Sequence, residues 1–191
     1  MEVMTAISGT IDAVMEQEEY QLPAGEVVEK FERRLKYANQ ELNPSIGNYE
    51  RVKNVAELYR LSGLIYLQRA ARGAFSSNPA VKELVDAAYN IIKRMESCGN
   101  TFPIFIIGCE ARSDERRAEI LRILRTTRSV LGSMNINRVH EFIERFWAQE
   151  DLDVEQTIEY TTKVTSVLAA GSWGSAELDG VYKDRSGPIA L

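Results

Sequence analysis

The feature that most constrains the fold is a short, almost entirely apolar run from Phe102 to Cys109. Periodicity alone cannot distinguish a buried strand from a buried helix in a run of this length. Thr101 can cap a helix at its start, and Pro103 fits the first helical turn. The rest of the chain offers no second strand, and a lone strand would leave its backbone hydrogen-bonding groups unsatisfied. We therefore expect a buried helix here, surrounded by other helices.

Apolar residues at helical spacing extend over most of the chain. Asn78, Ser113 and Asn135 are predicted N-caps, while Gly99 and Gly132 are expected to end the helices before them. Besides the apolar run, the expected helices cover residues 5–19, 24–42, 48–72, 79–95, 113–131, 135–147 and 154–170. We predict an all-α, single-domain bundle of about seven or eight helices around a central buried helix. The domain covers residues 1–170, and residues 171–191 form a flexible C-terminal tail.

The charge of the chain argues against direct nucleic-acid binding. The formal net charge is -5, whereas nucleic-acid modules normally carry a basic surplus because phosphate neutralisation supplies much of their affinity. Basic residues do gather between Arg112 and Arg145, but acidic residues are interleaved with them. Such a mixed pattern is typical of a solvated helix surface.

Metal sites and membrane spans are not expected either. Cys98, Cys109 and His140 show no metal-ligand spacing, so we predict no metal or other cofactor and two reduced thiols. No segment reaches the roughly 18 apolar residues that a membrane span needs. The N-terminus lacks the basic region of a signal peptide. We expect an intracellular protein, in the nucleus or the cytoplasm.

The apolar run and the residues after it resemble a known signature. The run ends in Gly108-Cys109-Glu110-Ala111, and this aromatic-Pro-apolar segment is similar to the signature of the fungal-specific transcription factor domain. That domain occurs in fungal regulators with a zinc binuclear cluster. A charged helix over 113–131 and a helix ending near Trp147 follow in the family's order. Residues 59–67 are similar to the family's long core helix.

The resemblance covers roughly residues 49–151 and implies the regulatory region of a fungal transcription factor. Such regulators bind DNA through an N-terminal cluster of six cysteines that holds two zinc ions. This chain contains two cysteines and therefore lacks that cluster. The expected function is an effector- or partner-responsive regulatory domain without the DNA-binding zinc cluster.

Glu110 is the most informative polar residue of the signature. An acid directly after a buried helix must reach the surface or find a partner. Arg112, Arg116 and Arg117 are near enough in sequence to supply one. We interpret Glu110 as half of an ion pair at the helix junction, with a ligand-binding or catalytic acid as the alternative.

Cys109 and His140 are weaker candidates. Cys109 is predicted to be a small core residue, and His140 a surface or boundary residue beside the apolar stripe of its helix. A thiol hydrolase would become possible if Cys109, His140 and Glu110 converged. We do not expect that convergence.

Three tyrosines complete the candidate site residues. Tyr59, Tyr66 and Tyr89 lie on the two helices with the clearest patterns and could line a pocket between them. Tyrosine hydroxyls in helical bundles more commonly reach the surface or a backbone carbonyl. The pocket is therefore the less favoured interpretation.

Three functions remain open from the sequence. The first is a non-catalytic regulatory module that transmits the binding of a small-molecule effector or a protein co-regulator to a DNA-binding domain elsewhere. The second is a small stand-alone enzyme or ligand-binding protein on the same helical scaffold, for example in fungal secondary metabolism, although no catalytic constellation is recognisable. The third is an oligomerisation domain, forming a homodimer through the Phe142–Trp147 stripe or the last helix.

Overall fold

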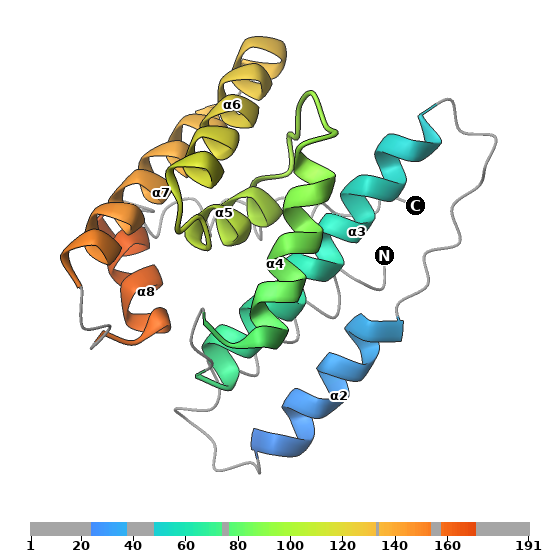
Figure 1. The fold of residues 1–191 in the computed structure, drawn as a ribbon, viewed down its shortest axis with the longest axis vertical. Coiled ribbons are helices and arrows are strands. Elements are labelled where there is room, and N and C mark those ends of the chain that lie inside the picture. Colours follow the sequence, from blue (N-terminus) through green and yellow to red (C-terminus); the bar gives the residue numbers. More distant parts are fainter. Residues whose placement is uncertain (1–23, 38–47, 74–76, 133, 154–157, 171–191) are drawn as a thin grey trace, which may run out of the picture.

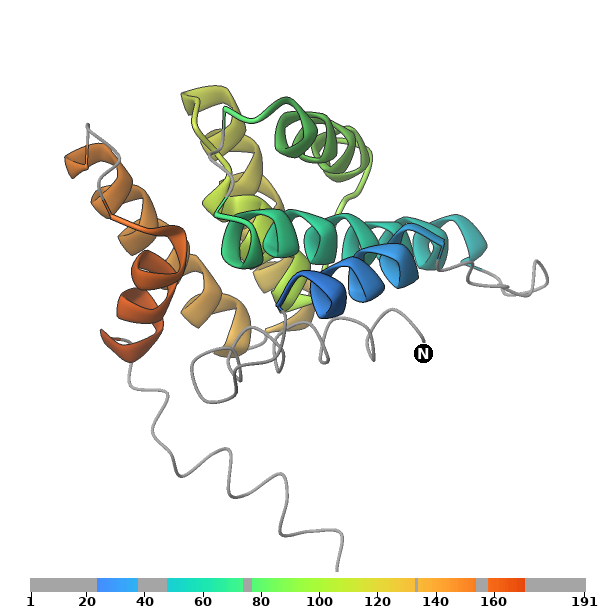
Figure 2. The ribbon, with the colours of Figure 1, turned by 90° about the horizontal axis from the view of Figure 1, so that it is seen from below.

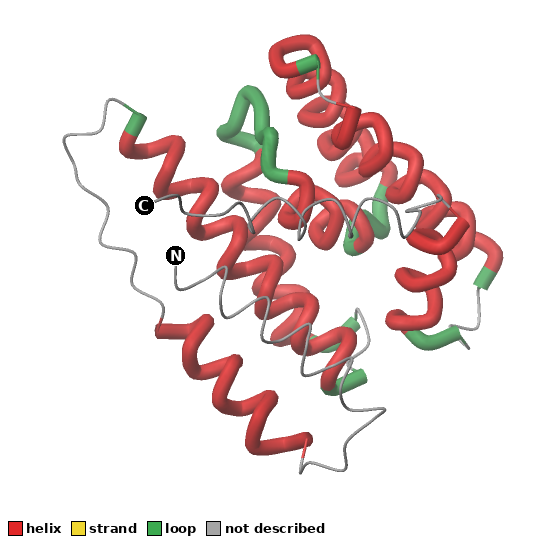
Figure 3. Tube along the Cα trace, turned by 180° about the vertical axis from the view of Figure 1, so that it is seen from behind, coloured by secondary structure: helices red, strands yellow, loops and turns green. Residues whose placement is uncertain are grey.

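The computed structural model describes residues 24–37, 48–73, 77–132, 134–153 and 158–170. All regular elements within these ranges are helices, so the predicted all-α fold is confirmed (Figures 1 and 3). The predicted helix over residues 5–19 and the predicted tail over 171–191 lie outside the described residues. The elements are α2 (Ala24–Tyr37), α3 (Tyr49–Tyr66), the π-helix η1 (Leu67–Ala71), α4 (Pro79–Ile92), α5 (Thr101–Cys109), α6 (Asp114–Leu131), α7 (Met134–Leu152) and α8 (Tyr160–Ala170).

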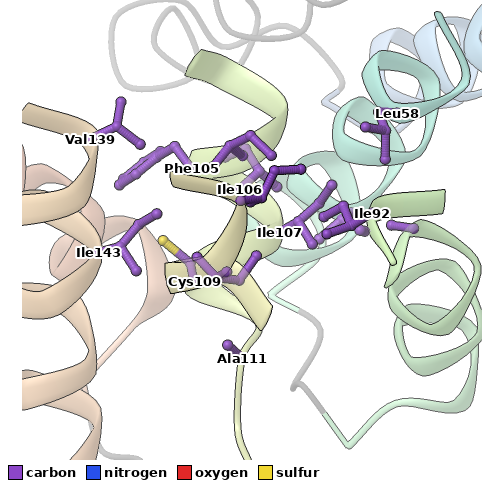
Figure 4. Close-up of a cluster of buried hydrophobic side chains, with 14 of the residues drawn as sticks. Leu58, Ile92, Phe105, Ile106, Ile107, Cys109, Ala111, Val139 and Ile143 are labelled. Carbon is purple, nitrogen blue, oxygen red and sulfur yellow. The ribbon is translucent and has the colours of Figure 1, made fainter. Parts of the chain in front are cut away.

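Helix α5 is the predicted central helix. Figure 1 shows it between the α3–α4 pair and the α6–α7 pair. Every residue from Pro103 to Cys109 is buried, as expected for a helix that is apolar all round. In Figure 4 the side chains of α5 reach Ile92 on one side and Ile143 on the other. The apolar run therefore joins the two halves of one hydrophobic core.

Helices α2 and α8 pack on the outside of this arrangement. Helix α2 lies along α3, where Leu35 and Leu64 form a small separate hydrophobic cluster (Figure 2). Glu32 of α2 also forms an ion pair with Arg72, which directly follows η1. Helix α8 packs against α7 and η1. Both outer helices therefore contact the segment at the end of α3.

The helix predicted over residues 48–72 is divided into two parts. After Tyr66 the α-helix continues as the π-helix η1, and Gly73 follows with a left-handed φ of 58°. A π-helix has i→i+5 hydrogen bonds, is rare, and occurs frequently at functional sites. The apolar pattern of the sequence did not predict this change of helix type.

The clearest capping predictions are confirmed. The Asn78 side chain accepts a hydrogen bond from the Ala80 N–H at 2.9 Å. The Ser113 hydroxyl accepts one from the Arg116 N–H at 3.3 Å. Gly132 ends α6 with a φ of 58°, a backbone conformation that glycine adopts at little cost.

The predicted end of the fourth helix at Gly99 is wrong. Helix α4 ends at Ile92, where Arg122 of α6 donates hydrogen bonds to the carbonyl oxygens of Ile92 and Met95, each at 3.1 Å. Gly99 serves a different purpose, because a Cβ atom there would lie 2.7 Å from Cδ1 of Leu131. The glycine lets the α4–α5 loop approach α6 closely.

Three other boundaries differ by a few residues. Asn100, not Thr101, occupies the N-cap position of α5, and its side chain donates to the Tyr59 hydroxyl at 3.0 Å instead of capping the helix. Asn135 lies inside α7, which begins at Met134. Helix α2 ends at Tyr37, and the remaining residues of its predicted range are outside the described part of the chain.

Within the described residues, none of the helices combines the length and apolar character required to cross a bilayer.

Candidate functional site

A group of charged side chains, all buried except that of the partly exposed Arg112, lies next to the C-terminal end of α5. It joins η1, the residues after α5, the end of α7 and the start of α8. Three basic and three acidic side chains make up this charge cluster, namely Arg69, Glu110, Arg112, Glu150, Asp153 and Lys163. Segments distant in the sequence therefore meet through charges, and not only through apolar packing.

Glu110 and Arg69 form a deeply buried pair at the centre of the cluster. Glu110 is 2% exposed and Arg69 is 7% exposed. The Arg69 Nε donates a hydrogen bond to Glu110 Oε1 at 3.0 Å. The Arg69 guanidinium also lies over the Tyr160 ring, 4.6 Å from its centroid. Residue Arg69 thus connects η1 with the end of α5 and with α8 at once.

The predicted ion pair at Glu110 is present, but its partner is Arg69 and none of the three arginines that follow Glu110 in sequence. Arg112 pairs with Glu150 on α7, and Arg116 pairs with Asp86 on α4. Arg117 pairs with Asp151 at the end of α7. Because Glu110 is directed into the protein beside α3, its closest partner comes from a helix 41 residues away in sequence.

Lys163 holds α8 to the end of α7. Its side chain is 4% exposed and its Nζ lies 2.7 Å from Asp153 Oδ2. It also pairs with Glu150, which in turn pairs with Arg112. Asp153 accepts a second hydrogen bond, at 3.2 Å, from the backbone N–H of Ile158. This half of the cluster therefore fixes both ends of the α7–α8 connection.

The balance of charges explains how such a cluster is tolerated inside the domain. Removing an ion from water costs several kcal/mol, and the attraction between buried partners offsets this cost only when the geometry is good. A complete cluster therefore adds little net stability, whereas removing one partner leaves a buried charge unpaired. The arrangement favours one relative position of α5, α7, α8 and η1.

Two ionisable groups beside the cluster remain protonated at neutral pH. Burial raises the pKa of Tyr160 well above its ordinary value, and its hydroxyl has no hydrogen-bond partner among the described residues. Burial also raises the pKa of the Cys109 thiol, and the nearby Glu110 carboxylate raises it further. Since the thiolate is the reactive form of cysteine, this environment suits a core residue and not a nucleophile.

His140 does not join Cys109 and Glu110. It lies on α7 with its side chain 31% exposed, and its Nε2 is 3.3 Å from Glu144 Oε1 without forming a hydrogen bond. Among the described residues, no contact links His140 to the thiol or to the Glu110 carboxylate. The residues of a thiol hydrolase triad are therefore not assembled here.

The three candidate tyrosines contact different parts of the molecule. Tyr59 stacks on Phe102 with ring centroids 6.2 Å apart. Tyr89 is 3% exposed and its hydroxyl donates to the Ile107 carbonyl at 3.4 Å. Tyr66 packs partly buried against the main core, and burial raises its pKa. Tyr59 and Tyr89 thus join α3 and α4 to α5, and the three side chains have different neighbours.

Tyr89 does line one surface depression, between α4 and α6. The depression has a volume of about 370 Å³ and is lined mainly by polar residues, namely Asp86, Tyr89, Asn90, Lys93, Glu115 and Arg116. Its charges pair with each other, because Arg116 contacts Asp86 and Lys93 Nζ lies 3.1 Å from Glu115 Oε1. Each of these four charged groups therefore already has a partner within the depression.

Each residue of the Gly108–Ala111 signature has a structural role. A Cβ at Gly108 would lie 2.5 Å from Cδ1 of Ile143, so glycine permits the close approach of α5 and α7. The Gly108 carbonyl accepts a hydrogen bond from the Trp147 indole at 2.8 Å. Cys109 and Ala111 are each 1% exposed. With the Glu110 ion pair, the signature connects the core to the charge cluster.

The residues that sequence reasoning missed are Arg69, Glu150, Asp153, Tyr160 and Lys163. A signal for two of them was present. Arg69 interrupts the nearly apolar C-terminal half of its helix, and Lys163 lies on the same face of α8 as Tyr160, Val164 and Val167. A charge on an apolar face requires a buried partner.

Comparison with known proteins identifies the family of the chain. Residues 2–175 match the family described as the fungal specific transcription factor domain. A similar protein is transcription factor iacI of Pestalotiopsis fici, with 34% identity over 113 residues. That alignment covers 59% of this chain and 29% of the relative's length. No solved structure matches. The chain, with its signature at the centre of an all-α core, belongs to the fungal specific transcription factor domain family.

Proposed function

We propose that this chain is a regulatory region that responds to a small-molecule effector or a protein co-regulator and alters the activity of a DNA-binding region located elsewhere. The observation that carries the proposal is the family match over residues 2–175. The similar transcription factor is aligned over 29% of its length, which is consistent with a regulatory part of a larger protein. The net charge of -5 also fits a region that does not bind DNA itself and leaves that contact to a separate DNA-binding region.

The charge cluster supports a regulatory role in a specific way. A ligand or partner shifts a conformational equilibrium only if it binds the two states with different affinities. The position of α8 depends on the Lys163 pairs and on the contact between Arg69 and Tyr160. An effector that competes for any of these charges would weaken the attachment of α8. The cluster is therefore the element through which binding changes the domain.

The proposal is tested by fusing the complete chain to a heterologous DNA-binding domain in a fungal host with a reporter gene. We expect reporter transcription to differ from that of the DNA-binding domain alone. A Glu110→Gln variant of the fusion should lose most of this difference, because the ion pair between Arg69 and Glu110 is lost. A Lys53→Gln variant, changed at an exposed position of α3, should behave like the unmodified fusion.

Two observations in the native fungus complete the test. Deleting the gene should change the abundance of a reproducible set of transcripts, and returning the unmodified gene should restore them. A fluorescently tagged product should concentrate in the nucleus. Unchanged transcripts after deletion, together with an inactive fusion, would contradict the proposed function.

A further inference from the structure

The free end of the α6–α7 hairpin differs in charge from the rest of the chain. Between Glu119 and Glu141 the sequence contains four arginines and no acidic residue. Because α6 and α7 are joined by a short connection, this stretch forms the end of the hairpin, at the top of Figure 1. We call the last two turns of α6 and the first turn of α7 the hairpin tip. The acidic residues of the hairpin therefore lie away from its tip.

The arginines at the two ends of α6 have different partners. Near its start, Arg116 pairs with Asp86 and Arg117 pairs with Asp151. Near its end, Arg125 and Arg128 are exposed, and no ion pair joins either of them to another described residue. The Nε of Arg125 donates only to the Leu121 carbonyl of its own helix, at 3.1 Å. The tip consequently carries positive charge that the described part of the domain does not neutralise.

Two apolar side chains are exposed in the same last turn. Val130 is 63% exposed and Leu131 is 49% exposed. Leu131 leans toward Gly99 of the α4–α5 loop, so part of its surface is covered while the remainder faces solvent. The last turn of α6 therefore combines the exposed Arg128 with two exposed apolar side chains, and arginine is enriched in protein-binding surfaces.

We propose that the hairpin tip is a docking surface for an acidic, amphipathic segment of a partner protein. Carboxylates of the segment pair with Arg125 and Arg128, and its apolar side chains cover Val130 and Leu131. Complementary charge speeds such encounters and excludes other partners. The apolar pair favours a peptide over a nucleic acid, because a phosphate backbone has no apolar groups to place there.

The experiment measures binding to the purified complete chain, so its outcome is independent of the transcription test above. The probe is a fluorescein-labelled peptide of alternating acidic and apolar residues (Asp, Glu, Leu and Phe), followed by fluorescence anisotropy. We expect saturable binding that weakens with added salt. Arg125→Glu with Arg128→Glu should weaken binding about tenfold or more. Val130→Ser should weaken it about threefold while leaving the salt dependence unchanged.

Matched controls separate a specific surface from general charge. Lys53→Glu with Lys82→Glu changes the net charge equally at exposed positions of α3 and α4 and should leave binding unchanged. Because all the substituted side chains are exposed, circular dichroism and Tm should stay close to those of the unmodified chain.

Several results would overturn the proposal. Absence of peptide binding at low salt would do so, as would an equal loss of affinity in the lysine control. Equal binding of a peptide with Asn and Gln in place of the acids would show that charge plays no part. Tighter binding of a DNA duplex than of the peptide, insensitive to Val130→Ser, would identify a polyanion site instead.

Discussion

Helix α5 and the charge cluster are adjacent in the chain and are stabilised by opposite kinds of interaction. From Pro103 to Cys109 every side chain is buried in apolar surroundings. The next residue, Glu110, is equally buried and forms an ion pair with Arg69. Apolar burial is non-directional and supplies most of the stability of a domain. Buried ion pairs supply little net stability, but they are satisfied in one geometry and penalise others.

Helix α5 and the charge cluster have different roles in the fold. The core around α5 keeps the domain folded, whereas the charge cluster determines where α8 and η1 lie relative to it. Under the proposed function, a partner or effector acts on the charge cluster without unfolding the core.

The largest effect is expected from Glu110→Gln. The substitution removes the carboxylate that the buried Arg69 guanidinium contacts at 3.0 Å, so the free energy of unfolding should fall by about 4 kcal/mol, measured by urea denaturation. The double variant Arg69→Met with Glu110→Met removes both charges. Its free energy of unfolding should fall clearly less than that of Glu110→Gln. A double variant as unstable as the single one would show that the pair itself stabilises the fold.

A large effect is also expected from Ile107→Ala in the centre of α5. Ile107 is fully buried, and truncation of such a residue costs about 3 kcal/mol through lost burial and a new cavity. The loss of stability should appear in urea and thermal unfolding, with no change in the affinity of the hairpin tip for the acidic peptide. Val130→Ala, at an exposed position, is the control and should change stability by less than about 0.5 kcal/mol. A similar loss in both variants would refute the central position of α5.

A smaller effect is expected from Gly108→Ala. The added Cβ would lie 2.5 Å from Cδ1 of Ile143, so the two helices must move apart or Ile143 must rotate, at a cost of about 1–3 kcal/mol. Ile143→Val removes that Cδ1 atom. In a double-mutant cycle the two substitutions should therefore be less harmful together than the sum of the single losses. If the two losses of stability simply add, the Cβ at position 108 is accommodated by a movement that does not involve Cδ1 of Ile143.

The smallest effect is expected for the exposed pair between Arg117 and Asp151. The two guanidinium nitrogens of Arg117 donate to Asp151 at 2.8 and 2.6 Å, and this hydrogen bonding lowers the pKa of Asp151 from 3.8. Because the pKa of Asp151 is lower in the folded state, the ion pair contributes to the free energy of unfolding above pH 3.8. This contribution is lost as the pH falls through the pKa of Asp151 in the folded state. Asp151→Asn should therefore cost less than about 1 kcal/mol at neutral pH.

The acid limit of the same pair provides its control. When the pH is below the folded-state pKa of Asp151, the unmodified chain and Asp151→Asn should have the same stability. A difference that persists in acid would show that the asparagine acts through packing and not through the ion pair.

The sequence predicted the helices better than their ends, and the core better than the charge cluster. The N-caps at Asn78 and Ser113 were predictable because a capping side chain bonds to backbone within a few residues. The end of α4 was not, because Arg122 from α6 supplies the hydrogen bonds that end it. The same applies to Glu110, whose ion-pair partner could not be chosen without knowing which helix lies beside it.

By itself, the sequence determined that this chain is an all-α domain with a buried helix from Thr101 to Cys109 at its centre, and it contained the signature of its family. These properties follow from apolar spacing and capping groups, which act over one or two helical turns. The tertiary structure alone decided the partner of Glu110, the place of Lys163 in a buried network and the exposure of the arginines at the hairpin tip. Ion pairs depend on distances in space, and the packing of helices far apart in the chain sets those distances.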